Sequence, residues 1–137
     1  ESCTGGLIAN RITNISGASE VFLAGYVTYA NSAKSDVLSV DPKLIEKHGA
    51  VSETVARAMA EGARARAGAT FGLGTTGIAG PTGGSDEKPV GTVYIALAAE
   101  DSQTVAKKFL FPTDRETFKH LAAQAALDLL RRKLLKQ

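Results

Sequence analysis

Three residues in the first quarter of the chain have the chemistry to activate a hydroxyl. Ser19 lies in a predicted loop, and Tyr29 and Lys34 follow it ten and fifteen residues later. A serine hydroxyl attacks a carbonyl carbon only when a base removes its proton, and a lysine amine acts as that base when its site keeps it neutral. From these residues alone, a turn position for Ser19 and a solvated helical position for Lys34 is the simpler interpretation.

Cys3 is a second candidate nucleophile, and it is the only cysteine in the chain. A single cysteine excludes an internal disulfide framework and a multi-cysteine zinc site. Because Cys3 precedes a predicted helix, the helix N-terminus would lower its pKa. The alternative is that Cys3 is a small buried residue.

Two glycine-rich segments could bind an anion. Thr4-Gly5-Gly6 begins a predicted helix, and residues 75–81, which contain Thr76, Gly77 and Gly80, follow a predicted strand. Backbone N–H groups at such positions bind phosphate or ribose, although neither segment has the spacing of a known nucleotide fingerprint. The alternative is that these glycines only make tight turns.

Arg115 opens the last predicted helix beside Asp114. It is either a bidentate ligand for a phosphate or a solvated residue of the first turn. The basic run over residues 131–133 is typical of a solvated helix end that complements the helix dipole.

The hydrophobic pattern predicts a first helix with Ile8, Ile12 and Ile15 on one face, then a buried strand over 21–29. Further helices are predicted over 31–38, over 42–48 after the N-cap Asp41, and over 53–68 after the N-cap Ser52. Strands are predicted over 69–75, 90–99 and 104–111, and the last is more polar, which places it nearer an edge of the sheet. Asp114 caps a long final helix that carries Phe118 and Leu121 on its apolar stripe. This order predicts an α/β fold, a mixed sheet covered by helices on both faces, with ligands at loops beyond the strand ends.

The composition is that of one globular domain spanning residues 1–137. Hydrophobic residues make up 44% of the chain, charged residues 22%, and the formal net charge is +2. That charge is too small to indicate nucleic-acid binding, and two histidines argue against a zinc centre. No apolar run is long enough to span a membrane and no signal peptide is visible, so we expect a cytoplasmic protein.

Several segments, taken together, resemble a known family. They are residues 1–6 (ESCTGG), residues 25–31 (GYVTYAN) with Lys34, residues 48–52 (HGAVS), residues 76–81 (TGIAGP) and residues 87–94 (EKPVGTVY). In this order and spacing they resemble the CinA C-terminal domain, which also occurs alone as the PncC-type nicotinamide-nucleotide amidase. The family domain begins upstream of Glu1 with a helix and a strand, so the resemblance implies that this chain lacks both.

The resemblance implies an α/β/α sandwich that hydrolyses nicotinamide mononucleotide to nicotinic acid mononucleotide and ammonia. It implies no metal or cofactor, no membrane or nucleic-acid partner, and a homodimer or higher homo-oligomer. It places the nucleophile on Ser19 and the base on Lys34. Further active-site positions fall on Tyr29 and Ser2, and nucleotide-binding positions on Thr76 and Arg115.

Three alternatives stay open at this point. The chain could be a non-catalytic nucleotide-binding or regulatory module linked to competence or DNA damage. It could hydrolyse the amide with Cys3 as the nucleophile. A DNA-associated protein is a third reading, which requires a steep salt dependence of binding.

Overall fold

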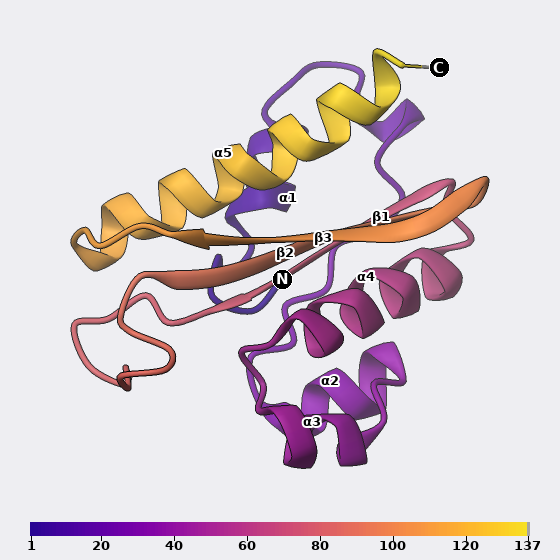
Figure 1. Ribbon diagram of the computed structural model, residues 1–137. Helices are drawn as coiled ribbons and strands as arrows, with labels where there is room; N and C mark the ends of the chain where they lie inside the picture. Colours follow the sequence, from indigo (N-terminus) through magenta and orange to yellow (C-terminus); the bar gives the residue numbers. More distant parts are fainter. Residues whose placement is uncertain (137) are drawn as a thin grey trace.

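The computed structural model describes residues 1–136 and shows three layers (Figure 1). A central sheet contains β1 (Phe71–Gly77), β2 (Thr92–Ala99) and β3 (Ser102–Leu110). One face is covered by α1 (Leu7–Thr13) and α5 (Arg115–Leu134), and the other by α4 (Glu53–Ala67). Helices α2 (Asn31–Leu38) and α3 (Pro42–His48) pack against α4, and the short 3₁₀ helix η1 (Ala18–Glu20) follows α1. The predicted three-layer α/β architecture is therefore confirmed.

The three described strands pair antiparallel in the order β1-β2-β3. Leu73 lies opposite Leu97 in the first pair, and Leu97 lies opposite Val105 in the second. The central strand β2 is almost entirely buried, whereas β3 lies at the edge and is mostly exposed. The edge position of the third strand was predicted from its polar composition, and it is confirmed.

The hydrophobic core lies on both faces of the sheet. Val93 and Ile95 of β2 pack with Phe118 and Ala122 of α5, and all four side chains are fully buried. On the opposite face the contact with α4 consists of alanines on both elements, Ala56, Ala60, Ala96 and Ala98. Small side chains let a helix lie close against a sheet, so α4 is held directly over β1 and β2.

Several helix ends follow the predicted capping residues. Asp41, Ser52 and Asp114 accept hydrogen bonds from backbone N–H groups in the first turns of α3, α4 and α5. These side chains satisfy donors that a helix cannot pair internally. The Asp114 cap fixes where α5 begins, and it therefore fixes the position of Arg115 one residue later.

The predicted buried strand over residues 21–29 is wrong. This segment has no regular secondary structure, and Val21, Leu23, Val27 and Tyr29 are 78%, 60%, 55% and 59% exposed. Its only backbone hydrogen bonds to the region before α1 join Tyr26 and Thr28 to Glu1. Because the segment does not join the sheet, the described strands are antiparallel throughout and not mixed.

Ile15 and Leu121, which were predicted on the apolar faces of the first and last helices, are also partly or largely exposed. Ile15 is 68% exposed because α1 ends at Thr13, two residues before it. Leu121 of α5 is 37% exposed, whereas Phe118 and Ala122 beside it are buried as predicted.

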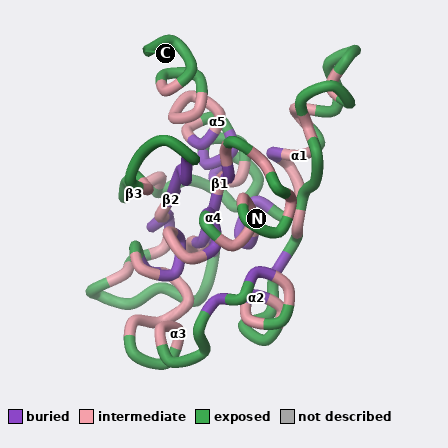
Figure 2. Tube along the Cα trace, turned by 90° about the vertical axis from the view of Figure 1, so that its right-hand side faces the viewer, coloured by how far each residue is buried: buried purple, intermediate pink, exposed green. Residues whose placement is uncertain are grey.

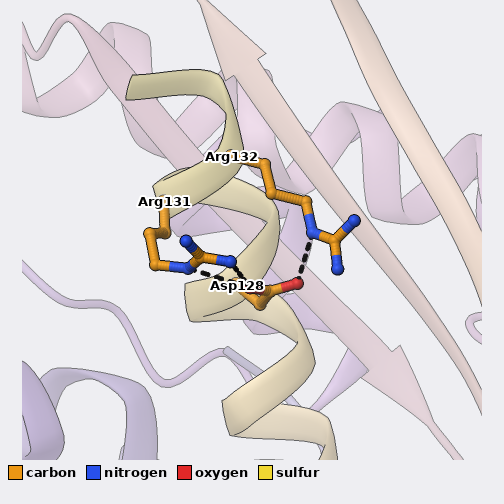
Figure 3. Close-up of polar contacts among 3 residues, drawn as sticks. All are labelled: Asp128, Arg131 and Arg132. Carbon is orange, nitrogen blue, oxygen red and sulfur yellow. Dashed lines mark hydrogen bonds and ion pairs between the residues drawn. The ribbon is translucent and has the colours of Figure 1, made fainter. Parts of the chain in front are cut away.

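The basic end of α5 carries its own counter-ion (Figure 3). Asp128 accepts hydrogen bonds from Arg131 at 2.7 Å and from Arg132 at 2.6 Å. These bonds, led by those from Arg131, lower the pKa of the Asp128 carboxyl. Two of the basic residues are thus engaged within the helix, which weakens the case for a nucleic-acid surface there. Within residues 1–136, no helix combines the length and the apolar character that crossing a bilayer requires.

Candidate active site

Lys34 is buried in the interior, and the candidate site is centred on its side chain. Its side chain is 1% exposed. The Nζ atom lies 2.8 Å from the carbonyl oxygen of Thr28, 3.1 Å from that of Tyr29 and 3.2 Å from Ser2 Oγ. All three partners are neutral oxygens, and no carboxylate of the described residues forms an ion pair with Lys34. A buried lysine held in this way is uncommon, because transferring an ammonium ion out of water is costly.

The position of Lys34 follows from helix α2. Lys34 and Leu38 are four residues apart, so they share the face of α2 that is turned inward. Burial removes water from the ammonium and lowers the Lys34 pKa below its usual value of 10.5. The site therefore favours the neutral amine more than solvent does. In the neutral amine, two N–H groups can donate to the carbonyls of Thr28 and Tyr29, which leaves the lone pair directed toward Ser2.

Ser2 is brought to Lys34 by the start of the chain lying beside β1. The backbone N–H of Ser2 donates to the carbonyl of Thr75 at 3.0 Å, and Ser2 is 8% exposed. The Ser–Lys contact that exists within one chain is therefore Ser2–Lys34. The resemblance placed Ser2 among the active-site positions, and its hydroxyl is the one that contacts the candidate base.

Tyr29 connects Lys34 to Arg115. Its carbonyl accepts from Lys34, while its phenol accepts a hydrogen bond of 3.0 Å from Arg115 Nη2. Arg115 Nη1 donates to the carbonyl of Gly80 at 2.8 Å. The first residue of α5 thus brings together the loop after β1 and the segment before α2, and a guanidinium lies at the edge of the site.

The anion-binding N-terminus of α1 holds a group from the chain itself. The Glu1 carboxylate accepts from the backbone N–H groups of Gly6, Ile8 and Ala9 at 3.1, 3.1 and 2.8 Å, and from Thr4 Oγ1 at 2.6 Å. The anion that these N–H groups bind is the Glu1 carboxylate. They are therefore not free to bind a substrate phosphate in this arrangement.

Three further residues proposed for the substrate site have structural roles. Thr76 is buried and donates from Oγ1 to the carbonyl of Ala50 at 2.8 Å. A Cβ at Gly77 would lie 2.7 Å from the carbonyl oxygen of Thr92, and one at Gly80 would lie 2.4 Å from Val90 Cγ1. Close packing alone requires glycine at both positions, so the turn interpretation accounts for them whether or not they also contact a ligand.

Cys3 does not have the lowered pKa predicted for it. The residue is 5% exposed, and burial raises the pKa of its thiol to about 12. Desolvation outweighs any stabilisation of the thiolate by the start of α1. Cys3 is thus an inert buried thiol, which agrees with the alternative interpretation that it is a small buried residue.

Ser19 lies away from Lys34 within the chain. An open hollow next to η1 is lined by residues 15–18 and 21 together with Leu127 of α5. Leu127 follows Arg115 by twelve residues on one helix, which separates them by about 18 Å. Figures 1 and 2 both show the chain leaving the end of α1 away from α2 and then running back to α2. The structure thus brings together Ser2, Tyr29, Lys34 and Arg115, but not Ser19.

Two residues near the site were not identified from the sequence. Glu1 fills the start of α1, as described above. The Nζ atom of Lys119 lies 3.4 Å from where a Cβ on Gly5 would be, so a second cation of α5 lies over the Thr4–Gly6 turn. The spacing of Arg115 and Lys119, four residues apart at the start of one helix, could have indicated a shared face. Within residues 1–136, no three His, Cys, Asp or Glu side chains gather as a metal site would need.

Comparison with known proteins gives one consistent family. The sequence model of the CinA C-terminal domain matches residues 1–134. A CinA-like protein of Acidobacterium capsulatum is 54% identical over 135 residues, which covers 98% of this chain and 32% of that protein. A CinA-like protein of Desulfosudis oleivorans is 57% identical with similar coverage, 98% and 33%. The chain thus spans about a third of the length of these curated relatives.

Solved structures agree with this result. The competence/damage-inducible protein CihA of Agrobacterium tumefaciens superposes with a TM-score of 0.93 at 42% identity, covering 99% of this chain and 82% of that one. A CinA superfamily protein of Klebsiella pneumoniae 700603 superposes with a TM-score of 0.94 at 33% identity, covering 99% and 84%.

Proposed function

The chain belongs to the CinA C-terminal domain family, and on that premise we propose that it is an amidase. The proposed reaction is hydrolysis of the carboxamide of nicotinamide mononucleotide, giving nicotinic acid mononucleotide and ammonia. The observation that carries the proposal is the buried Lys34, whose amine is desolvated, held by two carbonyls and in contact with a serine hydroxyl. A neutral amine beside a hydroxyl is what a Ser–Lys hydrolase requires.

The proposed mechanism begins with attack on the amide carbon. Ser19 is the nucleophile that the family resemblance indicates, but it does not contact Lys34 within one chain. The geometry instead supports Ser2 as the nucleophile, because its Oγ lies 3.2 Å from Lys34 Nζ. Its proton passes to the Lys34 amine as the Oγ–C bond forms. When the C–N bond breaks, Lys34 returns the proton to the leaving nitrogen and ammonia departs.

The second half of the reaction repeats these roles with water. Lys34 takes a proton from a water molecule, which attacks the ester on the serine. The serine oxygen then leaves with the proton that Lys34 took from water, and the carboxylic acid that forms loses its proton to solvent and becomes a carboxylate. Over both steps one water is consumed and one ammonia is released. The positive pyridinium ring of the substrate also favours the neutral form of a nearby lysine.

The substrate phosphate is proposed to bind at Arg115. Its guanidinium lies at the edge of the site, and Lys119 lies one turn further along the same helix. Arg115 already donates to Gly80 and Tyr29, so both of its partners hold it in a fixed orientation. An arginine fixed in this way loses little side-chain entropy when it binds a phosphate.

Two observations favour a second candidate, a nucleotide-binding module without catalysis. Ser19 and Lys34 do not meet within one chain, and Glu1 occupies the start of α1. Such a module would be stabilised by nicotinamide mononucleotide without hydrolysing it.

The test is ammonia release from nicotinamide mononucleotide by the intact protein, with free nicotinamide as the comparison substrate. Lys34→Ala and Ser2→Ala are expected to lose at least a hundredfold in kcat, which is about the smallest contribution of general base catalysis. Ser52→Ala is a matched control, since Ser52 is an equally buried serine whose hydroxyl bonds to the backbone of Gly49 and Val55 and not to Lys34. Stabilisation by the nucleotide without ammonia release would contradict the amidase and support the binding module.

A further inference from the structure

The serine hydroxyl that contacts the candidate base lies inside a turn that the preceding side chain closes. The Glu1 carboxylate accepts a hydrogen bond from Thr4 Oγ1 at 2.6 Å and one from the backbone N–H of Gly6 at 3.1 Å. Inside this turn, the carbonyl of Ser2 accepts from the N–H of Gly5 at 3.0 Å. The Glu1 side chain therefore spans Ser2 and holds the chain on its far side.

The shape of the turn depends on two glycines. Gly5 and Gly6 have φ angles of 60° and 96°, a left-handed conformation that residues with a Cβ rarely adopt. This conformation turns the chain back, so that the N–H groups of Ile8 and Ala9 also donate to the Glu1 carboxylate, at 3.1 and 2.8 Å. One carboxylate thus fixes the turn and the start of α1 together.

Thr4 joins the same turn to the sheet. Thr4 and Thr75 of β1 are both fully buried, and their hydroxyl oxygens lie 3.0 Å apart. A carboxylate only accepts hydrogen bonds, so Thr4 donates its proton to Glu1 and accepts the proton of Thr75. The carbonyl of Thr75 accepts the backbone N–H of Ser2 at 3.0 Å. One residue of β1 therefore holds the turn at Ser2 and again at Thr4.

The backbone of Glu1 connects the turn to the base. Its carbonyl accepts from the N–H of Thr28 at 2.9 Å, and the carbonyl of Thr28 accepts from Lys34 Nζ at 2.8 Å. The main chain of Glu1 thus contacts the segment that holds the amine, while its side chain holds the turn that carries the hydroxyl. Replacing the side chain would loosen the hydroxyl and leave the main-chain contact in place.

From these contacts we infer that Glu1 is a positioning residue, whose carboxylate acts through Thr4 and the start of α1 to hold Ser2 Oγ against Lys34 Nζ. This inference rests on the proposed amidase function with Ser2 as the nucleophile. Among residues 1–136, Glu1 forms no ion pair with Lys34, so its carboxylate acts through the geometry of the turn. Misplacing a reacting atom by about 1 Å can cost about a hundredfold in rate.

The first test is Glu1→Gln in the intact protein. Glutamine has the same shape, but its amide nitrogen donates, so it cannot accept from all four donors that the carboxylate serves. For ammonia release we expect kcat to fall about tenfold to a hundredfold, with KM within about twofold of the wild type. Asp41→Asn is the matched control, because Asp41 is an acidic cap on α3 and does not contact the turn.

A purely structural role for Glu1 predicts a different result. Glu1→Gln and Asp41→Asn would then both lose stability and keep the wild-type kcat, since each removes a helix cap. Circular dichroism shows whether each variant is folded. A folded Glu1→Gln variant with kcat within about twofold of the wild type would overturn the inference.

Thr4 supplies a second pair of variants, which decides the question if Glu1→Gln does not fold. Thr4→Val removes the hydroxyl at nearly the same shape, whereas Thr4→Ser keeps it. We expect Thr4→Val to lose kcat and Thr4→Ser to retain most of it. Because Glu1→Gln and Thr4→Val break the same hydrogen bond, the double variant should lose less than the product of the two single losses. Independent losses would contradict a role through that bond.

A third measurement does not require the nucleotide substrate. A fluorophosphonate reacts with an activated serine, forming an Oγ–P bond and releasing fluoride, while the hydroxyl proton passes to the base. Mass spectrometry identifies modified Ser2, and the rate of modification reports how well Ser2 is held against Lys34. Glu1→Gln and Thr4→Val should slow this reaction as much as they slow ammonia release, and Ser2→Ala should not react at that position.

The measurements separate the inference from the function on which it rests. If the wild type releases no ammonia but Ser2 is modified, and Glu1→Gln slows the modification, the amidase proposal fails and the positioning role stands. If the wild type releases ammonia and Glu1→Gln and Thr4→Val match it, the amidase stands and the inference is overturned. A wild-type Ser2 that takes part in neither reaction overturns both.

Discussion

The phenol of Tyr29 and the guanidinium of Arg115 lie 3.0 Å apart, although 86 residues separate them in the chain. The carbonyl of the same tyrosine accepts a hydrogen bond from Lys34. One residue therefore connects the candidate base to the candidate phosphate ligand. The amide and the phosphate of a mononucleotide must be held at a fixed separation, and Tyr29 is the residue that couples the two ends of the site.

Arg115→Ala is expected to weaken binding of the mononucleotide. Hydrogen bonds to a charged group contribute about 1.5–3 kcal/mol, so KM for nicotinamide mononucleotide should rise about tenfold to a hundredfold. Hydrolysis of free nicotinamide, which has no phosphate, should not change. Steady-state kinetics with both substrates checks this, with Arg132→Ala as the control because Arg132 pairs with Asp128 at the far end of α5. An equal loss on both substrates would remove Arg115 from the phosphate site.

Lys34→Arg is expected to be as inactive as Lys34→Ala. Arginine keeps the positive charge but does not lose its proton in a protein, so it cannot act as a base. A role for Lys34 as a fixed cation predicts the opposite, namely that Lys34→Arg keeps substantial activity. Circular dichroism on both variants is needed to show that the buried position still folds.

The pH dependence of the wild type follows from the same lysine. Burial lowers the Lys34 pKa below 10.5 and the base must be neutral, so kcat/KM should rise with pH through the Lys34 pKa. The midpoint of this rise should lie below 10.5, and it should be absent from the residual activity of Lys34→Ala. A rate that falls with rising pH over this range would contradict a lysine base.

Cys3 is expected to resist alkylation at pH 7–8, because burial keeps the thiol protonated with a pKa of about 12. Cys3→Ala should retain catalysis and lose about 1 kcal/mol of stability from the small cavity that it leaves. Mass spectrometry after iodoacetamide treatment and an ammonia-release assay check the two parts. Rapid modification that abolishes activity would restore Cys3 as a nucleophile.

Thr28→Val should leave the free energy of unfolding unchanged or raise it by about 1 kcal/mol. Thr28 Oγ1 is the one buried side-chain polar atom without a hydrogen-bond partner among the described residues, and valine replaces that hydroxyl at nearly the same shape.

Thr92→Val is the matched control for that prediction. Thr92 is equally buried, but its hydroxyl donates to the carbonyl of Pro89 at 2.7 Å. It should therefore lose about 1 kcal/mol or more. Urea denaturation of both variants measures the difference. A larger loss for Thr28→Val would show that its hydroxyl has a partner in solution.

The helices of this protein could be predicted from the sequence because their signals are local. Asp41, Ser52 and Asp114 cap the helices that they were expected to cap, and α2 ends at Leu38 as predicted. Capping depends on a side chain and a backbone group within a few residues of each other. No distant contact is needed to identify it.

The strand predicted over residues 21–29 shows the limit of local information. Its apolar and β-branched composition is that of a buried strand, but a strand exists only when a neighbour pairs with its backbone. Among residues 1–136, Glu1 provides the only bonds of that kind. The sequence predicted a buried strand here, whereas the tertiary structure shows a segment without regular secondary structure whose large apolar side chains are mostly exposed.

For the candidate site, too, some features could be predicted from the sequence and others depend on the tertiary structure. Local patterns in the sequence were enough to predict the capped helices, the edge strand and the residue types able to do amide chemistry. That Lys34 is buried, that Ser2 and not Ser19 contacts it within the chain, and that Glu1 fills the start of α1 became visible only in the folded chain. The physical reason is that burial and desolvation depend on contacts between residues far apart in the chain, and a one-dimensional pattern does not record which of them meet.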